Sequence, residues 1–119
     1  MSPADALVRV TGESWDARVL GAAEPVLVDF WAPWCVPCKK LEPALEDLAE
    51  RHRGRLTVAT LNVDEEPACA GRYDVLSLPT LMLFAGGEPV ARLTGAVKPK
   101  KIEAAVAPHL TTTDPEGPQ

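Results

Sequence analysis

The sequence predicts an α/β fold, with a central mixed β-sheet flanked by helices on both faces. Two observations support this fold class. Short apolar segments typical of strands alternate with segments of helical periodicity along most of the chain. The last two strand segments are joined by Gly86 and Gly87, which is a signal for a tight antiparallel hairpin. Alternation that ends in a hairpin implies a sheet with both parallel and antiparallel pairs.

The first half of the chain predicts a strand at residues 7–10, a short helix at 14–20 and a strand at 26–31. Trp15 and Val19 are spaced by four residues, so they share one face of the short helix, and Trp15 is expected in the core. The segment 26–31 is almost entirely apolar, which is typical of a strand buried on both faces. We therefore expect this strand at the centre of the sheet.

The segment 35–52 has the clearest helical pattern in the chain. Basic residues at 51–53 suit the C-terminal end of a helix, and Gly54 supplies a stop. Pro43 lies inside the segment, where its missing N–H and its ring should bend the helix. A single apolar stripe follows the helical spacing: Leu41, Ala44, Leu45, Leu48 and Ala49.

The second half of the chain predicts three strands and two further helices. Residues 111–119 are polar, include two prolines and are expected to fray, so the domain is expected to span residues 1–110. The expected elements are a strand at 56–63, a short helix that ends near 73, strands at 80–84 and 90–94, and a helix from 98 with Ile102, Ala105, Val106 and Leu110 on one stripe.

Composition excludes several classes of protein. The chain has 119 residues, 46% of them apolar, which fits one compact domain. Lys and Arg number 12 against 17 Asp and Glu, without a basic stripe, so we expect no nucleic-acid partner. The longest uncharged run, residues 75–87, is too short for a membrane span and contains Pro79. Residues 1–5 lack the pattern of a signal peptide, and we expect a reducing, cytoplasmic setting.

Cys35 and Cys38 are the strongest indication of chemistry. They are separated by two residues and lie between a buried strand and the start of a helix. Unpaired N–H groups and the helix dipole at that position lower the pKa of Cys35, which favours the nucleophilic thiolate. Cys38, one turn in and more shielded, would resolve the mixed disulfide that Cys35 forms. Pro37 suits the first turn, where its missing N–H costs nothing.

The cysteines have two other possible roles. A zinc half-site would need two more ligands, and the remaining candidates, Cys69, His52 and His109, have no paired spacing, so no metal is predicted. A static disulfide is the second. Cys69 itself is best explained as a small apolar side chain on a short helix, with a regulatory or dimer-forming thiol as the alternative.

Asp29 is the second unusual residue, because it interrupts a run that otherwise predicts a buried strand. Burial of a carboxylate raises its pKa, which suits a group that exchanges protons near neutral pH. By strand alternation Asp29 shares a face with Leu27 and Trp31, a face that the following helix could cover. A carboxylate that reaches solvent or pairs with a lysine is the equally weighted alternative.

Residues 29–39 read Asp-Phe-Trp-Ala-Pro-Trp-Cys-Val-Pro-Cys-Lys, and this segment closely resembles the active-site segment of the thioredoxin family. The resemblance extends from about residue 7 to 110. It includes the positions of the family's kink proline, cis-proline, hairpin glycine and surface glycine, at Pro43, Pro79, Gly87 and Gly95. It implies the thioredoxin fold.

The resemblance also implies residue roles. Cys35 is similar to the nucleophile and Cys38 to the resolving thiol, and the two would form the redox-active disulfide. Asp29 resembles the buried acid/base that assists Cys38 through water. Pro79 resembles the cis-proline beside the disulfide. The implied substrate-binding residues form an apolar surface around the thiol: Trp34, Val36, Pro37, Leu78, Pro79 and Gly95, with the backbone of Leu78 free to pair with a client.

Two residues depart from the family pattern. Val36 stands where the family most often has glycine, which enlarges the apolar rim around the thiol. Thr60 occupies the place where many members have a lysine near the buried aspartate. Without that positive charge, the proton affinity of Asp29 depends more on desolvation, so we expect a raised pKa.

The resemblance therefore predicts an enzyme, a protein-disulfide reductase that works by thiol–disulfide exchange. It binds no cofactor of its own, and its electrons are expected from NADPH through a separate thioredoxin reductase. The other expected partners are disulfide-containing client proteins, and the chain is expected to be a monomer. Two alternatives stay open: a thiol oxidase or isomerase, and a binding module that uses the same fold.

Overall fold

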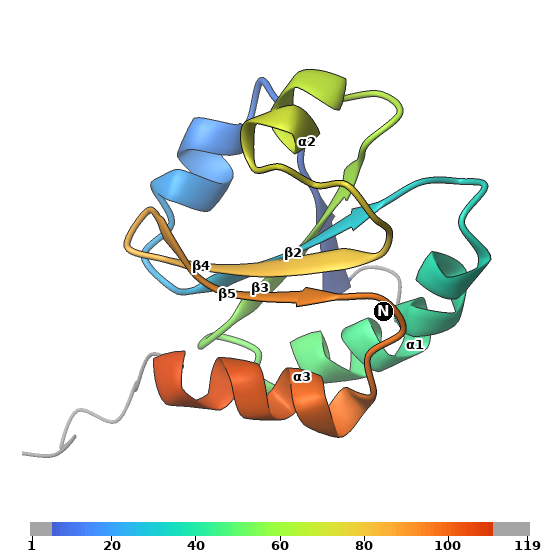
Figure 1. Cartoon of the computed structure of the whole chain (residues 1–119). Helices are drawn as coiled ribbons and strands as arrows, with labels where there is room; N and C mark the ends of the chain where they lie inside the picture. The colour runs from blue at the N-terminus through green and yellow to red at the C-terminus, as the bar shows by residue number, and fades with distance from the viewer. Residues whose placement is uncertain (1–5, 111–119) are drawn as a thin grey trace, which may run out of the picture.

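A five-stranded mixed sheet forms the centre of the molecule, with helices on both of its faces (Figure 1). The computed structural model describes residues 6–110, and the expected tail at 111–119 lies outside them. The strands are β1 (Leu7–Arg9), β2 (Val26–Trp31), β3 (Thr57–Asn62), β4 (Thr80–Ala85) and β5 (Glu88–Thr94). The helices are α1 (Val36–Arg51), α2 (Pro67–Arg72) and α3 (Pro99–Val106), with short helical segments η2 (Asp16–Leu20) and η3 (Ala107–His109).

The strand order across the sheet is β1-β3-β2-β4-β5. β3 pairs in parallel with β1 and β2, whereas β4 runs antiparallel to β2 and β5. The mixed sheet predicted from the sequence is confirmed, and β2 lies at its centre as expected. In this register Asp29 on β2 stands opposite Thr60 on β3 and Leu81 on β4.

One face of the sheet is covered by α1 and α3 (Figure 1). The stripe predicted for α1 is the side that packs there, since Leu41, Leu45 and Leu48 are all buried against sheet residues. Ile102 and Val106 of α3 are buried in the same cluster, again as the helical spacing predicted. No helix within residues 6–110 is long and apolar enough to cross a membrane.

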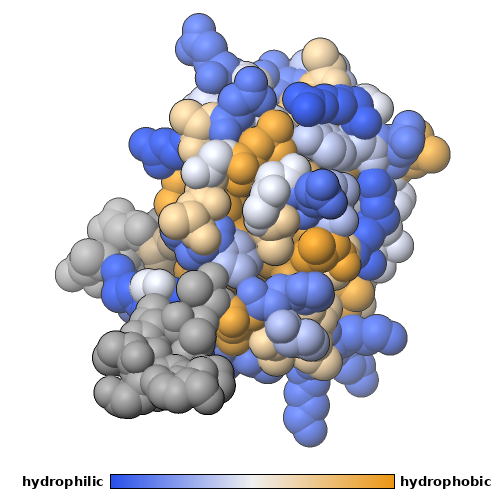
Figure 2. Space-filling view, turned by 90° about the vertical axis from the view of Figure 1, so that its left-hand side faces the viewer, coloured by the Kyte–Doolittle hydropathy of each residue, from blue (hydrophilic) through white to orange (hydrophobic). Residues whose placement is uncertain are grey.

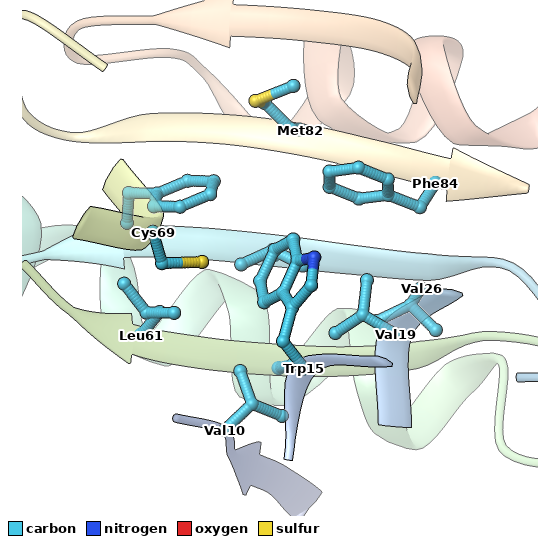
Figure 3. Close-up of a cluster of buried hydrophobic side chains, with 11 residues drawn as sticks. Val10, Trp15, Val19, Val26, Leu61, Cys69, Met82 and Phe84 are labelled. Atoms are coloured by element: carbon cyan, nitrogen blue, oxygen red, sulfur yellow. The ribbon is translucent and has the colours of Figure 1, made fainter. Parts of the chain in front are cut away.

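The opposite face is covered by η2 and α2 around an aromatic core (Figure 3). Trp15 is 1% exposed, as expected, and its ring meets Phe84 edge-on at a centroid distance of 5.3 Å. Its indole N–H donates a hydrogen bond to the hydroxyl of Tyr73 at 3.0 Å, so the one polar atom of the ring is satisfied. Cys69 of α2 lies in this cluster.

The segment expected as a short helix at 14–20 is a wider, π-helical turn over Asp16–Leu20. The backbone N–H of Gly21 donates to the carbonyl of Asp16, five residues earlier, at 2.7 Å. A Cβ at Gly21 would lie 3.2 Å from that carbonyl oxygen, so glycine permits the close approach. The prediction of a helical segment was right, and its hydrogen-bond pattern was not foreseen.

Two prolines lie where elements start or end. β5 starts at Glu88 and includes Pro89, two residues before the expected strand. β5 is an edge strand, and a proline that cannot donate to a ladder is tolerated there. The last helix is α only to Val106 and continues as the 3₁₀ turn η3, which contains Pro108.

Candidate active site

Cys35 and Cys38 lie at the N-terminus of α1, directly after the loop that leaves β2. Cys35 is the N-cap residue, with extended backbone angles of φ −91° and ψ 103°, and the N–H of Cys38 donates to its sulfur at 3.2 Å. The two residues form a disulfide with a Cα–Cα distance of 5.3 Å. The first turn of the helix therefore directs an N–H group at the sulfur of Cys35.

In this disulfide form Cys38 is only marginally more shielded than Cys35, less than the sequence led us to expect. Cys35 is 4% exposed and Cys38 is 3% exposed. Both sulfurs are enclosed by Ala32 and by the partly buried residues Trp31, Val63 and Leu78. The two cysteines differ in their position on the helix, with Cys35 at its N-cap and Cys38 one turn in.

Asp29 is 4% exposed, so the alternative in which it reaches solvent is wrong. None of the ion pairs formed by residues 6–110 involves it, and its Oδ1 atom has no hydrogen-bond partner among the described residues. Burial, reinforced by the charge of Glu42, raises its pKa from 3.8 to about 7. A raised pKa of Asp29 was expected, because residue 60 is a threonine and not a lysine.

Asp29 and Cys38 border the same cavity, of about 410 Å³. α1 covers the face of β2 that carries Asp29 and Trp31, as strand alternation predicted. The cavity is lined by Leu7, Arg9, Asp29, Trp31, Cys38, Lys39, Glu42 and Thr60. A buried carboxyl group and the second cysteine of the pair thus border one cavity that is large enough to hold water.

The loop between α2 and β4 reaches the same end of the sheet as the cysteine loop (Figure 1). The peptide bond between Leu78 and Pro79 is cis, as the resemblance implied. Leu78 packs against the cysteine pair, and the carbonyl of Pro79 accepts a hydrogen bond from the N–H of Gly95 at 2.9 Å. Gly95 has a φ of +84°, which favours glycine, so this contact fixes a turn beside Pro79.

The residues expected to form an apolar docking surface differ in exposure. Trp34 is 67% exposed, with its indole N–H bound to the carboxylate of Asp64 at 3.0 Å, and Val36 is 59% exposed. Pro37 is exposed too, whereas Leu78 is half-buried and Pro79 is buried. Figure 2 shows the other end of the molecule, where hydrophobic residues on the visible surface are interrupted by polar ones.

Sequence reasoning missed two residues of this region. Leu76 is 94% exposed in the loop that leads to Pro79. In the sequence, Leu76 could have been noticed as an apolar residue that fits no helical or strand pattern. Glu42 lines the cavity, and its signal was the spacing of four residues from Cys38, which places both on one face of α1.

The remaining candidates lie away from the cysteine pair. His52 is buried between α1 and α3. Its Nε2 atom is 2.9 Å from a carboxylate oxygen of Glu103, and its Nδ1 atom is 3.1 Å from a guanidinium nitrogen of Arg55. Cys69 is buried on the opposite face of the sheet and is not paired with another cysteine. Among residues 6–110, no three His, Cys, Asp or Glu side chains cluster in a way that could hold a metal ion.

Comparison with known proteins agrees with this geometry. The family model described as Thioredoxin matches residues 6–108. Thioredoxin 1 of Nostoc sp. is 40% identical over 105 residues, which cover 88% of this chain and 98% of the relative. Thioredoxin of Alicyclobacillus acidocaldarius is 50% identical over 87 residues, 73% of this chain and 83% of the relative. The bifunctional thioredoxin reductase/thioredoxin of Mycobacterium leprae is 52% identical over 89 residues, 75% of this chain and only 19% of the relative's length.

Proposed function

The chain belongs to the thioredoxin family, and from that premise we propose that it reduces disulfide bonds in other proteins by thiol–disulfide exchange. The observation that carries this proposal is the Cys35–Cys38 disulfide at the N-terminus of α1, with the buried Asp29 on the cavity beside Cys38. A helix N-terminus favours a thiolate, and a carboxyl group near neutral pKa can take up the proton of the second thiol.

In the first step the thiolate of Cys35 attacks one sulfur of a client disulfide. A new bond forms between that sulfur and Cys35, the client disulfide breaks, and the second client sulfur leaves as a thiolate that takes up a proton. The N–H of Cys38 points at the sulfur of Cys35, and this donor stabilises the negative charge of the attacking thiolate.

In the second step Cys38 breaks the mixed disulfide. Its thiol gives a proton to the carboxylate of Asp29 through water in the shared cavity, and the resulting thiolate attacks the sulfur of Cys35. The Cys35–Cys38 bond forms, and the first client sulfur leaves as a thiolate. A pKa of about 7 makes Asp29 a stronger base than an ordinary carboxylate.

Client binding is assigned to the surface around the cysteine pair. Trp34, Val36 and Pro37 supply exposed apolar area, which favours an apolar stretch of a client. We propose that the backbone of Leu78 pairs with an extended client segment; its position next to the cis bond and against the cysteines supports this role. Gly95 completes this surface, and its N–H donates a hydrogen bond to the carbonyl of Pro79.

The electrons are proposed to come from NADPH through a separate thioredoxin reductase, with no cofactor bound by this chain. The name of the Mycobacterium leprae relative, which joins a thioredoxin reductase to a thioredoxin, favours that donor. We assign the chain to a reducing cytoplasm, as a monomer. A coupled assay tests the electron route: NADPH oxidation by a bacterial thioredoxin reductase should depend on the concentration of this chain, and no dependence would contradict it.

The reductase activity is tested by the reduction of insulin in the presence of dithiothreitol. The wild-type chain should precipitate the insulin B chain much faster than dithiothreitol alone, and Cys35→Ser should remove that acceleration. Cys69→Ser is the matched control, since it removes a cysteine outside the site and should keep the wild-type rate. A wild-type rate no faster than that of Cys35→Ser would refute the proposal.

A further inference from the structure

The cavity beside Cys38 has a buried floor and an exposed mouth. Asp29 and Cys38, on the floor, are each less than 5% exposed. The charged residues of the lining, Arg9, Lys39 and Glu42, are all exposed. The cavity therefore connects solvent with the buried carboxyl group, and the three charged side chains lie at its mouth.

The charges that face Asp29 come from two elements, β1 and α1. β1 supplies Arg9, whose guanidinium is held by the carboxylate of Glu65 at 2.7 Å, so part of its positive charge is compensated there. α1 supplies Lys39 and Glu42 together with the thiol of Cys38. On β3 and β4 the residues opposite Asp29 are uncharged, Thr60 and Leu81.

Glu42 is the charged group that acts most clearly on Asp29. Burial is the largest cause of the raised pKa of Asp29, and the negative charge of Glu42 raises it further. Glu42 follows Cys38 by four residues on the same helix, so the helix holds it in a fixed relation to the floor of the cavity. Glu42 lies one turn along α1 from Cys38 and is exposed at the mouth of the cavity.

We propose that Glu42 is a positioning residue of the exchange reaction, whose negative charge at the cavity mouth holds a proton on Asp29 and strengthens Asp29 as a base toward Cys38. This inference rests on the proposed function. The step is a proton transfer: the S–H bond of Cys38 breaks, an O–H bond forms on Asp29, and the thiolate of Cys38 then displaces the client sulfur from Cys35. Asp29 later returns the proton to water, so the carboxylate that accepts a proton from Cys38 is regenerated.

The first test measures the titration of Asp29 in the oxidised protein by carboxyl ¹³C NMR. The oxidised form is used because neither cysteine of the pair then titrates. In Glu42→Gln the midpoint should move to lower pH, with the ionised fraction of Asp29 at pH 6 rising about twofold or more. Glu42→Asp, which keeps the charge, should restore most of the wild-type titration.

Glu46→Gln is the matched control, since Glu46 lies one turn further along α1 and does not line the cavity. It should leave Asp29 unchanged. A Glu42→Gln variant in which Asp29 titrates as in the wild type, or moves no more than in Glu46→Gln, overturns the inference. Thermal unfolding of the variants shows that each is folded, so a shift of Asp29 is read from a native protein.

The second test measures the step that Asp29 assists. Reduced protein is mixed by stopped flow with an aromatic disulfide that releases a coloured thiolate, and the second release reports the attack by Cys38. In Glu42→Gln the pH profile of that second release should move to lower pH, and its rate at pH 8 should fall several-fold. The first release, by Cys35, should keep its rate. An unmoved profile would contradict the role of Glu42 even where the wild type reduces insulin, so failure of this inference is separable from failure of the proposed function.

Discussion

The Cys35–Cys38 pair and the single Cys69 differ in their surroundings much more than in their burial. Cys35 and Cys38 are 4% and 3% exposed, and Cys69 is 9% exposed. Cys35 caps a 16-residue helix and receives an N–H donor, and Cys38 borders a cavity with a buried carboxyl group. Cys69 sits among apolar and aromatic side chains on the other face of the sheet (Figure 3).

Similar burial therefore accompanies opposite reactivity in the two regions. In the apolar core it raises the pKa of Cys69, because desolvation outweighs the nearby charge of Arg72, and the thiol stays protonated and unreactive. Beside α1 the helix N-terminus opposes that penalty for Cys35, and Asp29 offers a place for the proton of Cys38. Thiol reactivity in this protein therefore follows from local donors and acceptors, and four substitutions test this conclusion.

Cys38→Ser should produce the largest effect. Without the resolving thiol, the mixed disulfide between Cys35 and a client should persist roughly a thousandfold longer, because an intramolecular attack has been removed. The complex is counted on non-reducing gels after incubation with a disulfide-bonded protein. Cys69→Ser should trap nothing, and an equal yield of trapped complex from Cys69→Ser would remove the distinction between the two regions.

Asp29→Asn should stabilise the protein at alkaline pH. The pKa of Asp29 in the folded state, about 7, exceeds the ordinary value of 3.8, so protonation of Asp29 stabilises the fold. This stabilisation is fully present below pH 3.8 and is lost as the pH rises through 7. A neutral amide avoids that loss, and the free energy of unfolding at pH 8 should rise by about 2–4 kcal/mol, with almost no gain at pH 3. Urea unfolding at both pH values checks this. A gain of the same size at pH 3 would show that ionisation of Asp29 is not the cause.

Cys69→Ser should destabilise the fold and leave the activity intact. The substitution places a hydroxyl in an apolar cluster, which costs about 1–3 kcal/mol unless a partner is found. Cys69→Ala is the milder control, with a loss near 1 kcal/mol. Urea unfolding gives the free energies, and the insulin assay gives the rates. A lowered rate in a folded Cys69→Ser variant would contradict the assignment of this thiol to packing.

Thr60→Lys should have the smallest effect. An ammonium group opposite Asp29 would stabilise the carboxylate, lower the pKa of Asp29, and raise the free energy of unfolding at pH 8 by about 1 kcal/mol or less. Thr60→Gln controls for the longer side chain. NMR titration of Asp29 in both variants checks the shift, and equal titrations would show that charge opposite Asp29 has no influence there.

Periodicity and spacing in the sequence were sufficient for most of the fold. The stripe of Leu41, Leu45 and Leu48, the apolar run of β2 and the glycine pair of the hairpin each depend on local spacing, which the structure preserves. The position of Cys35 at a helix start was predictable for the same reason. The π-helical turn at Asp16–Leu20 was not, because it depends on a backbone contact with Gly21 that no residue pattern encodes.

The parts of the site that escaped prediction depend on contacts between elements. The cavity that joins Asp29 to Glu42 exists because β1, β2, β3 and α1 leave a space between them, and no segment alone indicates it. The shielding of Cys35 comes from Leu78, which is 43 residues away in the chain. The pair formed by His52 and Glu103 likewise joins two helices that are distant in sequence.

The most direct test of the difference between the two regions is the rate of alkylation of each cysteine. The reduced, folded protein is treated with limiting iodoacetamide at pH 7, and the modified peptides are quantified by mass spectrometry. Cys35 should react at least about a hundredfold faster than Cys69, because the sulfur of Cys35 accepts an N–H donor at the N-cap of α1, whereas burial raises the pKa of Cys69. Equal rates in the folded protein, or a faster reaction at Cys69, would contradict the account.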